Sequence, residues 1–509
     1  MRGPVIADII RKPRLSRGEA DRLAVVFGET RRTYRELDER TTALAAGLLE
    51  AGFVKGDRVA ILAHNRAEYV EAFFGIAKAG GVAVPVNYLL RASEVAYHLD
   101  DAAARWTFVE QRFLDVMRPL AAERPDHRLV VFDGPHEATE HGYEKLVAKG
   151  GGAKDLPPVG PDDVSLLQYT SGTTGRPKGA THTQAGVVLN ATAQSLDMPI
   201  REEDVYLCIP ALCWAAGLHS GLMAWLQRGA TVVLHPSGGF DPDIVCARIA
   251  EQRITSMIMV PVVLRAVLNS GALERHDVSS LRMLLVGAEP VPVELLDRLY
   301  AALPHVEVVQ GYGQSEFPTI MAILDSKYAR DKAGSTGKAL SFVELKVVDE
   351  SGADTAAGEH GEILCRSAAT MIGYWNKPEE TEAAFVDGWL RTGDRGWVDE
   401  DGFLYIAGRS KDLIISGGLN VYPAEVERVL AEHPSVAECA VVGTEDDRLG
   451  EVGRAFVVLR DGAGATEGEL IEHCREHLAG YKVPRHWVMR EEPLPRTSSG
   501  KAQKFKLKA

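Results

Sequence analysis

One short stretch, YTSGTTGRPKG at residues 169–179, combines bare backbone, hydroxyl groups and positive charge. Its chemistry-bearing residues are Gly172, Gly175 and Gly179, the hydroxyl residues Thr170, Ser171, Thr173 and Thr174, and the cations Arg176 and Lys178. Glycines let backbone N–H groups approach an anion closely, and hydroxyls and cations add donors and charge. The stretch therefore predicts a phosphate-binding loop, although a flexible surface loop uses the same residue types. It is not a Walker A loop, because Pro177 stands five residues after Gly172, where that motif has glycine.

Other stretches carry residues that suit a ligand. GAEPVP (287–292) and QGYGQSE (310–316) each follow an apolar run that predicts a parallel strand. Ligands in open α/β sheets bind just beyond the carboxyl ends of the strands. Three more stretches place carboxylates or cations next to glycine-rich turns, namely GWLRTGD (388–394), GRSKDLIISGGLN (408–420) and PRTSSGK (495–501).

The elements that must position these stretches follow from apolar patterning. Apolar runs such as 58–65, 82–87, 231–236, 256–261 and 281–289 alternate with helical patterns such as 67–80. This alternation predicts parallel sheets covered by helices on both faces. From about residue 340 short strands and tight turns predict an antiparallel or barrel-like piece, and a small α+β unit follows residues 408–412. We expect an α/β fold whose large N-terminal domain, residues 1–408, has two doubly wound sheets and a distorted β-barrel. A small mobile α+β domain, residues 409–509, is expected to complete it.

Composition excludes several classes of protein. The 509 residues carry a net charge of −14, without an evident basic face, which argues against nucleic acid as a partner. The six cysteines are scattered and form no CxxC pair, so neither a zinc site nor a disulfide framework is expected. The first residues contain no long apolar run, and the last ones are no peroxisomal address. We therefore expect a cytoplasmic enzyme without a membrane span.

Taken together, these stretches resemble the adenylate-forming superfamily of acyl-CoA synthetases, adenylation domains and luciferases. The resemblance runs from YRELDE (34–39) to Lys501, and its motifs keep the family's order and spacing. It implies a two-step reaction, in which a carboxylate attacks the α-phosphate of ATP and a thiol, usually that of coenzyme A, then displaces AMP. The implied partners are a small carboxylic acid, ATP, Mg²⁺ and coenzyme A.

The resemblance also implies roles for individual residues. The loop would wrap the β- and γ-phosphates, Tyr312 would lie against adenine, and Asp394 would accept hydrogen bonds from the ribose hydroxyls. Arg409 would contact the same sugar or the phosphate, and Ser315 stands where the family usually has threonine. The full set of implied nucleotide-binding residues is Thr170, Ser171, Gly172, Thr173, Thr174, Gly175, Lys178, Gly287, Ala288, Glu289, Gln310, Gly311, Tyr312, Gly313, Gln314, Ser315, Asp394 and Arg409.

Further implied roles concern catalysis and domain motion. Lys501 would bridge the substrate carboxylate and the α-phosphate, where a fixed cation stabilises the charge of the transition state. Glu316, with Thr173, would hold Mg²⁺, a cation that prefers oxygen ligands. Lys411 matches the hinge about which the small domain rotates, and Gly417 and Gly418 would line the coenzyme A tunnel.

The acid itself is left open by the sequence. By resemblance the acyl pocket is lined by segments 209–221 and 259–267, with Cys213, Trp214, Gly217, Val260 and Pro261. Leu212 and Cys213 replace the aromatic–histidine pair of most acyl-CoA relatives, so gating by histidine is in doubt. No aspartate lies in the first segment, which disfavours an α-amino acid. Small residues there leave room for a bulky apolar acid or simply pack a helix, and His219 is either a packing residue or a substrate contact.

Several functions fit these motifs. An acid–CoA ligase acting on a fatty, aryl or bulky cyclic acid is the leading interpretation. An acyl-AMP ligase that loads a carrier protein is the first alternative, and a non-catalytic nucleotide-binding relative is the second. Luciferase-type oxidation shares the motifs but needs a specialised substrate. The oligomeric state is not readable from the sequence.

Overall fold

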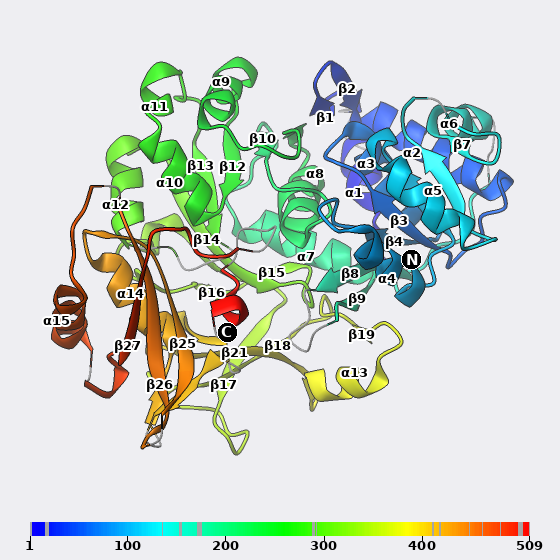
Figure 1. Ribbon diagram of the computed structural model, residues 1–509. Helices are drawn as coiled ribbons and strands as arrows, with labels where there is room; N and C mark the ends of the chain where they lie inside the picture. Colours follow the sequence, from blue (N-terminus) through cyan, green and yellow to red (C-terminus); the bar gives the residue numbers. More distant parts are fainter. Residues whose placement is uncertain are drawn as a thin grey trace.

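The computed structural model describes residues 3–15, 20–134, 136–151, 155–170, 176–287, 291, 293–409, 412–416, 419–446, 448–460, 462–478, 480–496 and 502–507. These residues form four sheets, two of them large and mostly parallel and two smaller and mostly antiparallel (Figure 1). Structure and sequence prediction agree on an α/β fold with a large N-terminal part and a smaller C-terminal part. The exact boundary at residue 408 stays a prediction.

The first large sheet has the strand order β19-β9-β8-β4-β3-β5-β6-β7. Its strands are β3 (Arg58–Leu62), β4 (Val82–Pro85), β5 (Trp106–Val109), β6 (Arg128–Val131), β7 (His141–Gly142), β8 (Val164–Thr170), β9 (Lys178–Thr183) and β19 (Gly373–Tyr374). Strands β3 to β8 are parallel to their neighbours, whereas β9 and β19 add an antiparallel edge. The helices that accompany this sheet are α2 (Tyr34–Glu50), α3 (Ala67–Lys78), α4 (Ala92–Asp101), α5 (Leu114–Ala122) and α6 (Tyr143–Gly150). Strands β3 and β4 and helix α3 begin at the residues where the predicted segments 58–65, 82–87 and 67–80 begin.

The second large sheet has the order β16-β15-β14-β13-β12-β10-β11-β1-β2. Its strands are β1 (Leu23–Phe27), β2 (Thr30–Thr33), β10 (Val205–Cys208), β11 (Thr231–Leu234), β12 (Ser256–Met259), β13 (Met283–Gly287), β14 (Glu307–Gln314), β15 (Thr319–Leu324) and β16 (Lys338–Ala339). Its helices are α7 (Gln184–Asp197), α8 (Ala224–Arg228), α9 (Pro242–Gln252), α10 (Pro261–Asn269), α11 (Ala272–Arg275) and α12 (Val293–Ala302). Helix α9 begins at Pro242, because the Asp241 side chain accepts a hydrogen bond from the Asp243 amide and proline suits the first turn of a helix.

Two smaller sheets follow along the chain. The first contains β17 (Glu344–Val348), β18 (Gly361–Arg366), β20 (Phe385–Val386), β21 (Trp389–Val398) and β22 (Leu404–Arg409), all antiparallel, with helix α13 (Pro378–Ala384) before β20. The second contains β23 (Ile414–Ser416), β24 (Leu419–Val421), β25 (Val436–Asp446), β26 (Gly450–Leu459) and β27 (His486–Arg490), with helices α14 (Pro423–Glu432) and α15 (Glu467–His477). In Figure 1 this last sheet, in orange and red, lies at one side of the molecule.

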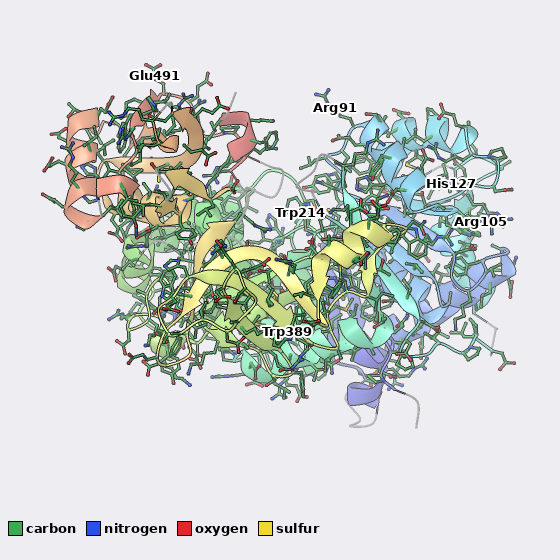
Figure 2. The ribbon with its side chains drawn as sticks, turned by 90° about the horizontal axis from the view of Figure 1, so that it is seen from below. Arg91, Arg105, His127, Trp214, Trp389 and Glu491 are labelled. Carbon is green, nitrogen blue, oxygen red and sulfur yellow. The ribbon has the colours of Figure 1, made fainter. Side chains whose placement is uncertain are left out.

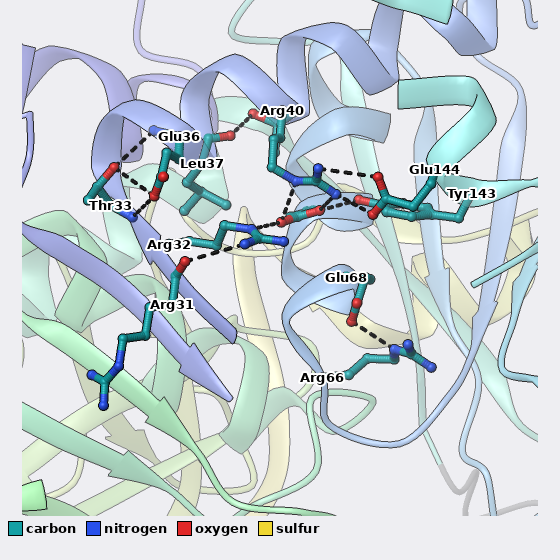
Figure 3. A network of polar contacts seen from close by, with 12 residues as sticks. Arg31, Arg32, Thr33, Glu36, Leu37, Arg40, Arg66, Glu68, Tyr143 and Glu144 are labelled. Carbon is teal, nitrogen blue, oxygen red and sulfur yellow. Dashed lines mark hydrogen bonds and ion pairs between the residues drawn. The ribbon is translucent and has the colours of Figure 1, made fainter. Parts of the chain in front are cut away.

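A buried ion network fastens the helices of the first sheet to one another (Figure 3). Glu71 of α3 is fully buried and accepts hydrogen bonds from Arg32 Nε at 2.8 Å and from Arg40 at 2.9 Å. The Tyr143 hydroxyl donates to the same carboxylate, and Arg40 also binds Glu144. A buried carboxylate is stable only when its charge is paired in this way. The network therefore ties strand β2 and helices α2, α3 and α6 together.

In the described part of the chain, no helix combines the length and the apolar character that crossing a bilayer requires.

Candidate active site

Several predicted site segments come at the carboxyl ends of strands in the second large sheet, and they therefore lie at one edge of it. Strands β10, β12, β13 and β14 are parallel neighbours, so their carboxyl ends lie side by side. The segments that follow them contain, in this order, Cys213 and Trp214, then Val260 and Pro261, then Gly287, then Ser315 and Glu316. This is the edge of a parallel sheet at which ligands bind.

Close backbone approach explains the glycines of the QGYGQSE stretch. Gly287 at the end of β13 faces Gly311 of β14, and a Cβ on Gly287 would lie 2.5 Å from the Gly311 carbonyl oxygen. A Cβ on Gly313 would collide with the backbone of Thr319 on β15. These positions therefore require glycine, and the strands are drawn together on both sides of Tyr312. Gln310 and Gln314, the other predicted members of β14, each have a buried amide nitrogen without a partner among the described residues.

Three predicted nucleotide-binding residues meet in one hydrogen-bonded group. The Tyr312 hydroxyl donates to Asp394 Oδ2 at 2.6 Å, and Arg409 Nε lies 2.8 Å from Asp394 Oδ1. Asp394 and Arg409 are cross-strand partners on β21 and β22, which aims both side chains the same way. Burial, reinforced by the Asp394 charge, raises the pKa of Tyr312 well above its usual range. The phenol is therefore a fixed donor, and residues 82 positions apart in the chain share one site.

Glu316 connects this edge to the first sheet. Its carboxylate accepts a hydrogen bond from the Tyr374 hydroxyl at 2.8 Å, and its carbonyl accepts one from the Met371 amide at 2.9 Å. Lys178 Nζ lies 4.6 Å from the centre of the Tyr374 ring, a cation–π contact. One tyrosine thus brings the predicted metal ligand Glu316 close to the predicted phosphate-binding residue Lys178.

The predicted phosphate-binding loop lies partly outside the described residues, which end at Thr170 and resume at Arg176. Thr170 and Lys178 are the last paired residues of the β8–β9 hairpin, so Ser171, Gly172, Thr173, Thr174 and Gly175 connect its two strands. Ala288 and Glu289, the predicted wall of the adenine site, also lie outside.

Asp101 at the end of α4 holds the base of the hairpin. Its carboxylate accepts a hydrogen bond from the Tyr169 hydroxyl at 2.7 Å and pairs with Lys377 Nζ at 2.8 Å. The Tyr97 hydroxyl donates to the Pro177 carbonyl at 2.8 Å. Both arms of the hairpin are therefore tied to one helix.

The predicted acyl segments show two kinds of backbone. Residues Ala216–Met223 form a π-helix, a rare element that occurs frequently at functional sites. A Cβ on Gly217 would collide with the Ala211 carbonyl, so this position needs glycine. Pro261 occupies the first turn of α10 and Val260 caps it. Cys213 is buried, which raises the pKa of its thiol to about 12 and keeps the thiol neutral. Its neighbour Trp214 is labelled near the middle of the view in Figure 2.

In the C-terminal part, Lys411, Gly417, Gly418 and Lys501 all lie outside the described residues. Their flanks are described, since β23 and β24 pair on either side of Gly417 and Gly418. Arg496, the second residue of the PRTSSGK segment, forms a β-bridge with Ala502, the residue that follows Lys501. Lys504 pairs with Glu427 at 2.7 Å just beyond it. The described residues thus leave the roles predicted for these four residues untested.

Comparison with known proteins identifies the family. The model of the AMP-binding enzyme family matches residues 14–375, and that of the AMP-binding enzyme C-terminal domain matches residues 425–501. The chain belongs to the AMP-binding enzymes. It is similar to a feruloyl-CoA synthase of Amycolatopsis sp, with 39% identity over 481 residues that cover 94% of each chain. It is also similar to an indoleacetate–CoA ligase of Aromatoleum aromaticum, with 37% identity over 488 residues, 96% of this chain and 94% of that one.

Solved structures of AMP-binding enzymes have the same fold. An anthranilate CoA ligase in complex with anthranoyl-AMP superposes with a TM-score of 0.90 at 31% identity, covering 100% of this chain and 97% of that one. The o-succinylbenzoate CoA synthetase of Bacillus subtilis, in complex with the acyl-adenylate OSB-AMP, gives a TM-score of 0.84 at 32% identity, with 100% and 99% covered.

Two residues of the candidate site were not predicted from the sequence. Tyr374 contacts the predicted metal ligand Glu316, and Asp101 contacts Tyr169, the neighbour of the predicted phosphate-binding residue Thr170. Tyr374 stands in a GYW stretch that resembles no phosphate or metal motif, and Asp101 ends an ordinary amphipathic helix. The contacts of Tyr374 and Asp101 become apparent only in the folded structure, in which distant segments of the chain lie side by side.

Proposed function

We propose that this AMP-binding enzyme is an ATP-dependent carboxylic acid–CoA ligase that works through an acyl-adenylate. The observation that carries the proposal is the match of both family modules along nearly the whole chain, to relatives that are CoA ligases. Two of the similar structures hold an acyl-AMP. The hydrogen-bonded group of Tyr312, Asp394 and Arg409 supports a nucleotide site at the same place.

The reaction proceeds in two displacements. A carboxylate oxygen of the acid attacks the α-phosphorus of ATP, and the bond to the β-phosphate oxygen breaks to release pyrophosphate. The thiolate of coenzyme A then attacks the acyl carbon, and the bond to the AMP oxygen breaks. A free carboxylate is a poor electrophile because it has no good leaving group. The first step supplies one, since AMP leaves readily from the acyl-adenylate.

Each step uses side chains in the roles that the resemblance implies. The loop of residues 170–175 and Lys178 bind the leaving pyrophosphate, Asp394 binds the ribose and Tyr312 packs against adenine. The carboxylate of Glu316 is a hard oxygen donor of the kind that Mg²⁺ prefers. Mg²⁺ neutralises phosphate charge when bound. Among the described residues no three His, Cys, Asp or Glu side chains cluster as metal ligands. Thr173, the second predicted ligand, lies outside the described residues.

Lys501 is the proposed cation at the reacting centre. Its position near the end of the chain requires the C-terminal part to approach the site during adenylation. We propose domains at residues 1–408 and 409–509, with the hinge at Lys411 and the coenzyme A tunnel at Gly417 and Gly418. The start of the last sheet at Ile414 supports this division. A cytoplasmic location stays a prediction.

The acid is proposed to be mainly apolar, either fatty, aryl or bulky and cyclic. The buried, neutral Cys213 and the small residues around Gly217 support an apolar binding segment without a charged partner for an ammonium group.

Acid-dependent exchange of labelled pyrophosphate into ATP tests the adenylation step. The proposal predicts exchange that requires Mg²⁺ and a carboxylic acid but not coenzyme A, and that Asp394→Ala lowers strongly. Exchange that is independent of added acid, or absent with every acid class while ATP still binds, contradicts it.

A further inference from the structure

Two buried histidines lie beside each other next to the proposed acyl segment. His182 is on strand β9 and His219 is in the π-helix Ala216–Met223, and each side chain is 1% exposed. Their ring centres are 6.5 Å apart. His182 belongs to none of the motifs assigned above, and His219 lies in the predicted acyl segment 209–221, where its role was left open.

Most of the hydrogen-bonding capacity of this pair is unused. His182 Nε2 lies 2.9 Å from the Ser315 carbonyl oxygen, which can only accept, so Nε2 carries the proton and donates. Burial lowers the pKa of His182 to about 4 and that of His219 to about 3, so both rings are neutral at pH 7. His182 Nδ1 is therefore a bare acceptor, and it has no partner in the described part of the chain. Neither ring nitrogen of His219 has one there either.

Such a set of unpaired groups needs an explanation. A buried polar group without a partner costs about 1–3 kcal/mol, and native proteins contain few of them. A histidine that only packs the core normally hydrogen-bonds with its ring nitrogens. His219 is therefore not a satisfied packing residue, one of the two readings that the sequence left open.

The pair lies between the acyl segment and the nucleotide-binding strand. His182 binds the backbone of Ser315, the neighbour of Glu316. Next to His219, Ser220 Oγ lies 2.9 Å from Thr319 Oγ1, and the backbone of Thr319 meets Gly313. The π-helix that carries His219 begins two residues after Trp214. An acyl chain whose carboxylate reaches the α-phosphate would occupy this region.

We propose that His182 and His219 bind a hydroxyl group on the acyl part of the substrate, an inference that rests on the ligase function proposed above. A hydroxyl offers one proton and two lone pairs. It donates to His182 Nδ1 and accepts from the N–H of His219, so one atom pairs two of the three unpartnered nitrogens. A ketone carbonyl has no proton for Nδ1, and an alkyl group leaves all three of these nitrogens unpaired. The preferred substrate is thus an apolar acid that carries a hydroxyl away from its carboxylate.

Matched pairs of acids test this inference. Cinnamate against 4-hydroxycinnamate, 3-phenylpropanoate against its 4-hydroxy derivative, and decanoate against 10-hydroxydecanoate differ by one hydroxyl. Pyrophosphate release is measured with each acid to obtain kcat and KM. For at least one pair, we expect a preference of about 10- to 100-fold in kcat/KM for the hydroxylated acid, since losing the bond strands buried groups.

Substitutions of His182 and His219 test whether these two residues cause the preference for the hydroxylated acid. His219→Leu places an apolar side chain of similar size at that position, and it should reduce the preference to within about threefold. His182→Leu should do the same. Because it also removes the hydrogen bond to the Ser315 carbonyl beside Glu316, the ratio of the two kcat/KM values within each variant is what is compared. His235→Leu is the matched control, because His235 is also buried with an unpartnered Nδ1 but lies at the end of β11. It should leave the preference intact.

The outcomes separate the inference from the ligase function. If wild type shows no preference in any pair, or if both His219→Leu and His182→Leu retain it, a buried water rather than substrate satisfies the rings and the inference is wrong. Acyl-sulfamoyladenosines are unreactive analogues of the acyl-adenylates. Their Kd values, measured by calorimetry for each hydroxylated and unhydroxylated pair, report the same preference without turnover. Hydroxyl-dependent binding that His219→Leu abolishes, in a protein that makes no acyl-CoA, would uphold the inference and overturn the ligase function.

Discussion

Asp101 is expected to control how well the enzyme uses ATP, although it lies outside every recognised motif. Its carboxylate binds the Tyr169 hydroxyl and Lys377, and Tyr97 of the same helix holds the Pro177 carbonyl. These contacts flank residues 171–175 on both sides. Asp101→Ala should leave the β8–β9 hairpin, the proposed phosphate-binding element, poorly ordered, so that ATP binding has to order it.

The magnitude follows from the contacts that are lost. A hydrogen bond to a charged acceptor contributes about 1.5–3 kcal/mol. Lys377 is 26% exposed, so its ion pair is screened and adds at most about 1 kcal/mol. The sum of about 1.5–4 kcal/mol corresponds to a loss of roughly 10- to 700-fold in kcat/KM for ATP if all of it orders the loop. Tyr169→Phe removes only one bond and is the matched partial variant, with a smaller loss.

The assay compares the two half-reactions. Pyrophosphate exchange at varied ATP concentration reports adenylation, and thioester formation from supplied acyl-AMP and coenzyme A involves no β- or γ-phosphate. We expect Asp101→Ala to impair the first and to change the second by less than about threefold, within ordinary surface effects. Equal losses in both half-reactions, or an unchanged ATP dependence in a folded variant, would refute the reasoning.

Three further substitutions test other parts of the account. Lys501→Ala should abolish acyl-AMP formation yet spare thioester formation from supplied acyl-AMP, and equal loss of both steps would remove Lys501 from adenylation. Asp394→Ala should weaken ATP binding by about 10- to 100-fold, the worth of charge-assisted hydrogen bonds, and an unchanged calorimetric Kd would contradict a ribose site there. Glu71→Gln leaves the guanidinium groups of Arg32 and Arg40 facing a neutral amide. It should lower the free energy of unfolding by about 3 kcal/mol, visible as a lower urea midpoint, whereas an unshifted midpoint would show that the network adds little stability.

Local patterns in the sequence were enough to predict much of the fold. Strands β3, β12 and β13 are apolar runs bounded by turn residues, and helix α9 begins with an Asp-Pro cap. These features depend on neighbours in the chain, so periodicity and capping reveal them. The alternation of strands and helices then implied parallel sheets and a ligand edge.

Long-range pairing was beyond such reasoning. Strand β1, near the start of the chain, joins the second large sheet beside β11, and β19 crosses back to the first sheet beside β9. The π-helix Ala216–Met223 has no periodic signal of its own, because its apolar and small residues suit an ordinary buried helix. Register between distant strands is set by packing across the whole core, which no local window contains.

The candidate site likewise combines residues that local sequence motifs predict with residues that only the three-dimensional structure reveals. Asp394, Arg409 and Tyr312 were predicted from motifs, and the described structure brings them together. Asp101 and the unused nitrogens of His219 become meaningful only when their surroundings are known, because a single aspartate or histidine has no distinctive sequence context.

Mass spectrometry of one reaction set tests the central claim most directly. The protein is incubated with ATP, Mg²⁺ and a panel of fatty, aryl and cyclic acids, each with and without coenzyme A. The account predicts an acyl-AMP mass without coenzyme A and an acyl-CoA mass with it, for at least one class of acid. Acyl-AMP that persists in the presence of coenzyme A would contradict the CoA ligase and indicate a carrier-protein acceptor, and the absence of any adduct in a protein that binds ATP would contradict the ligase altogether.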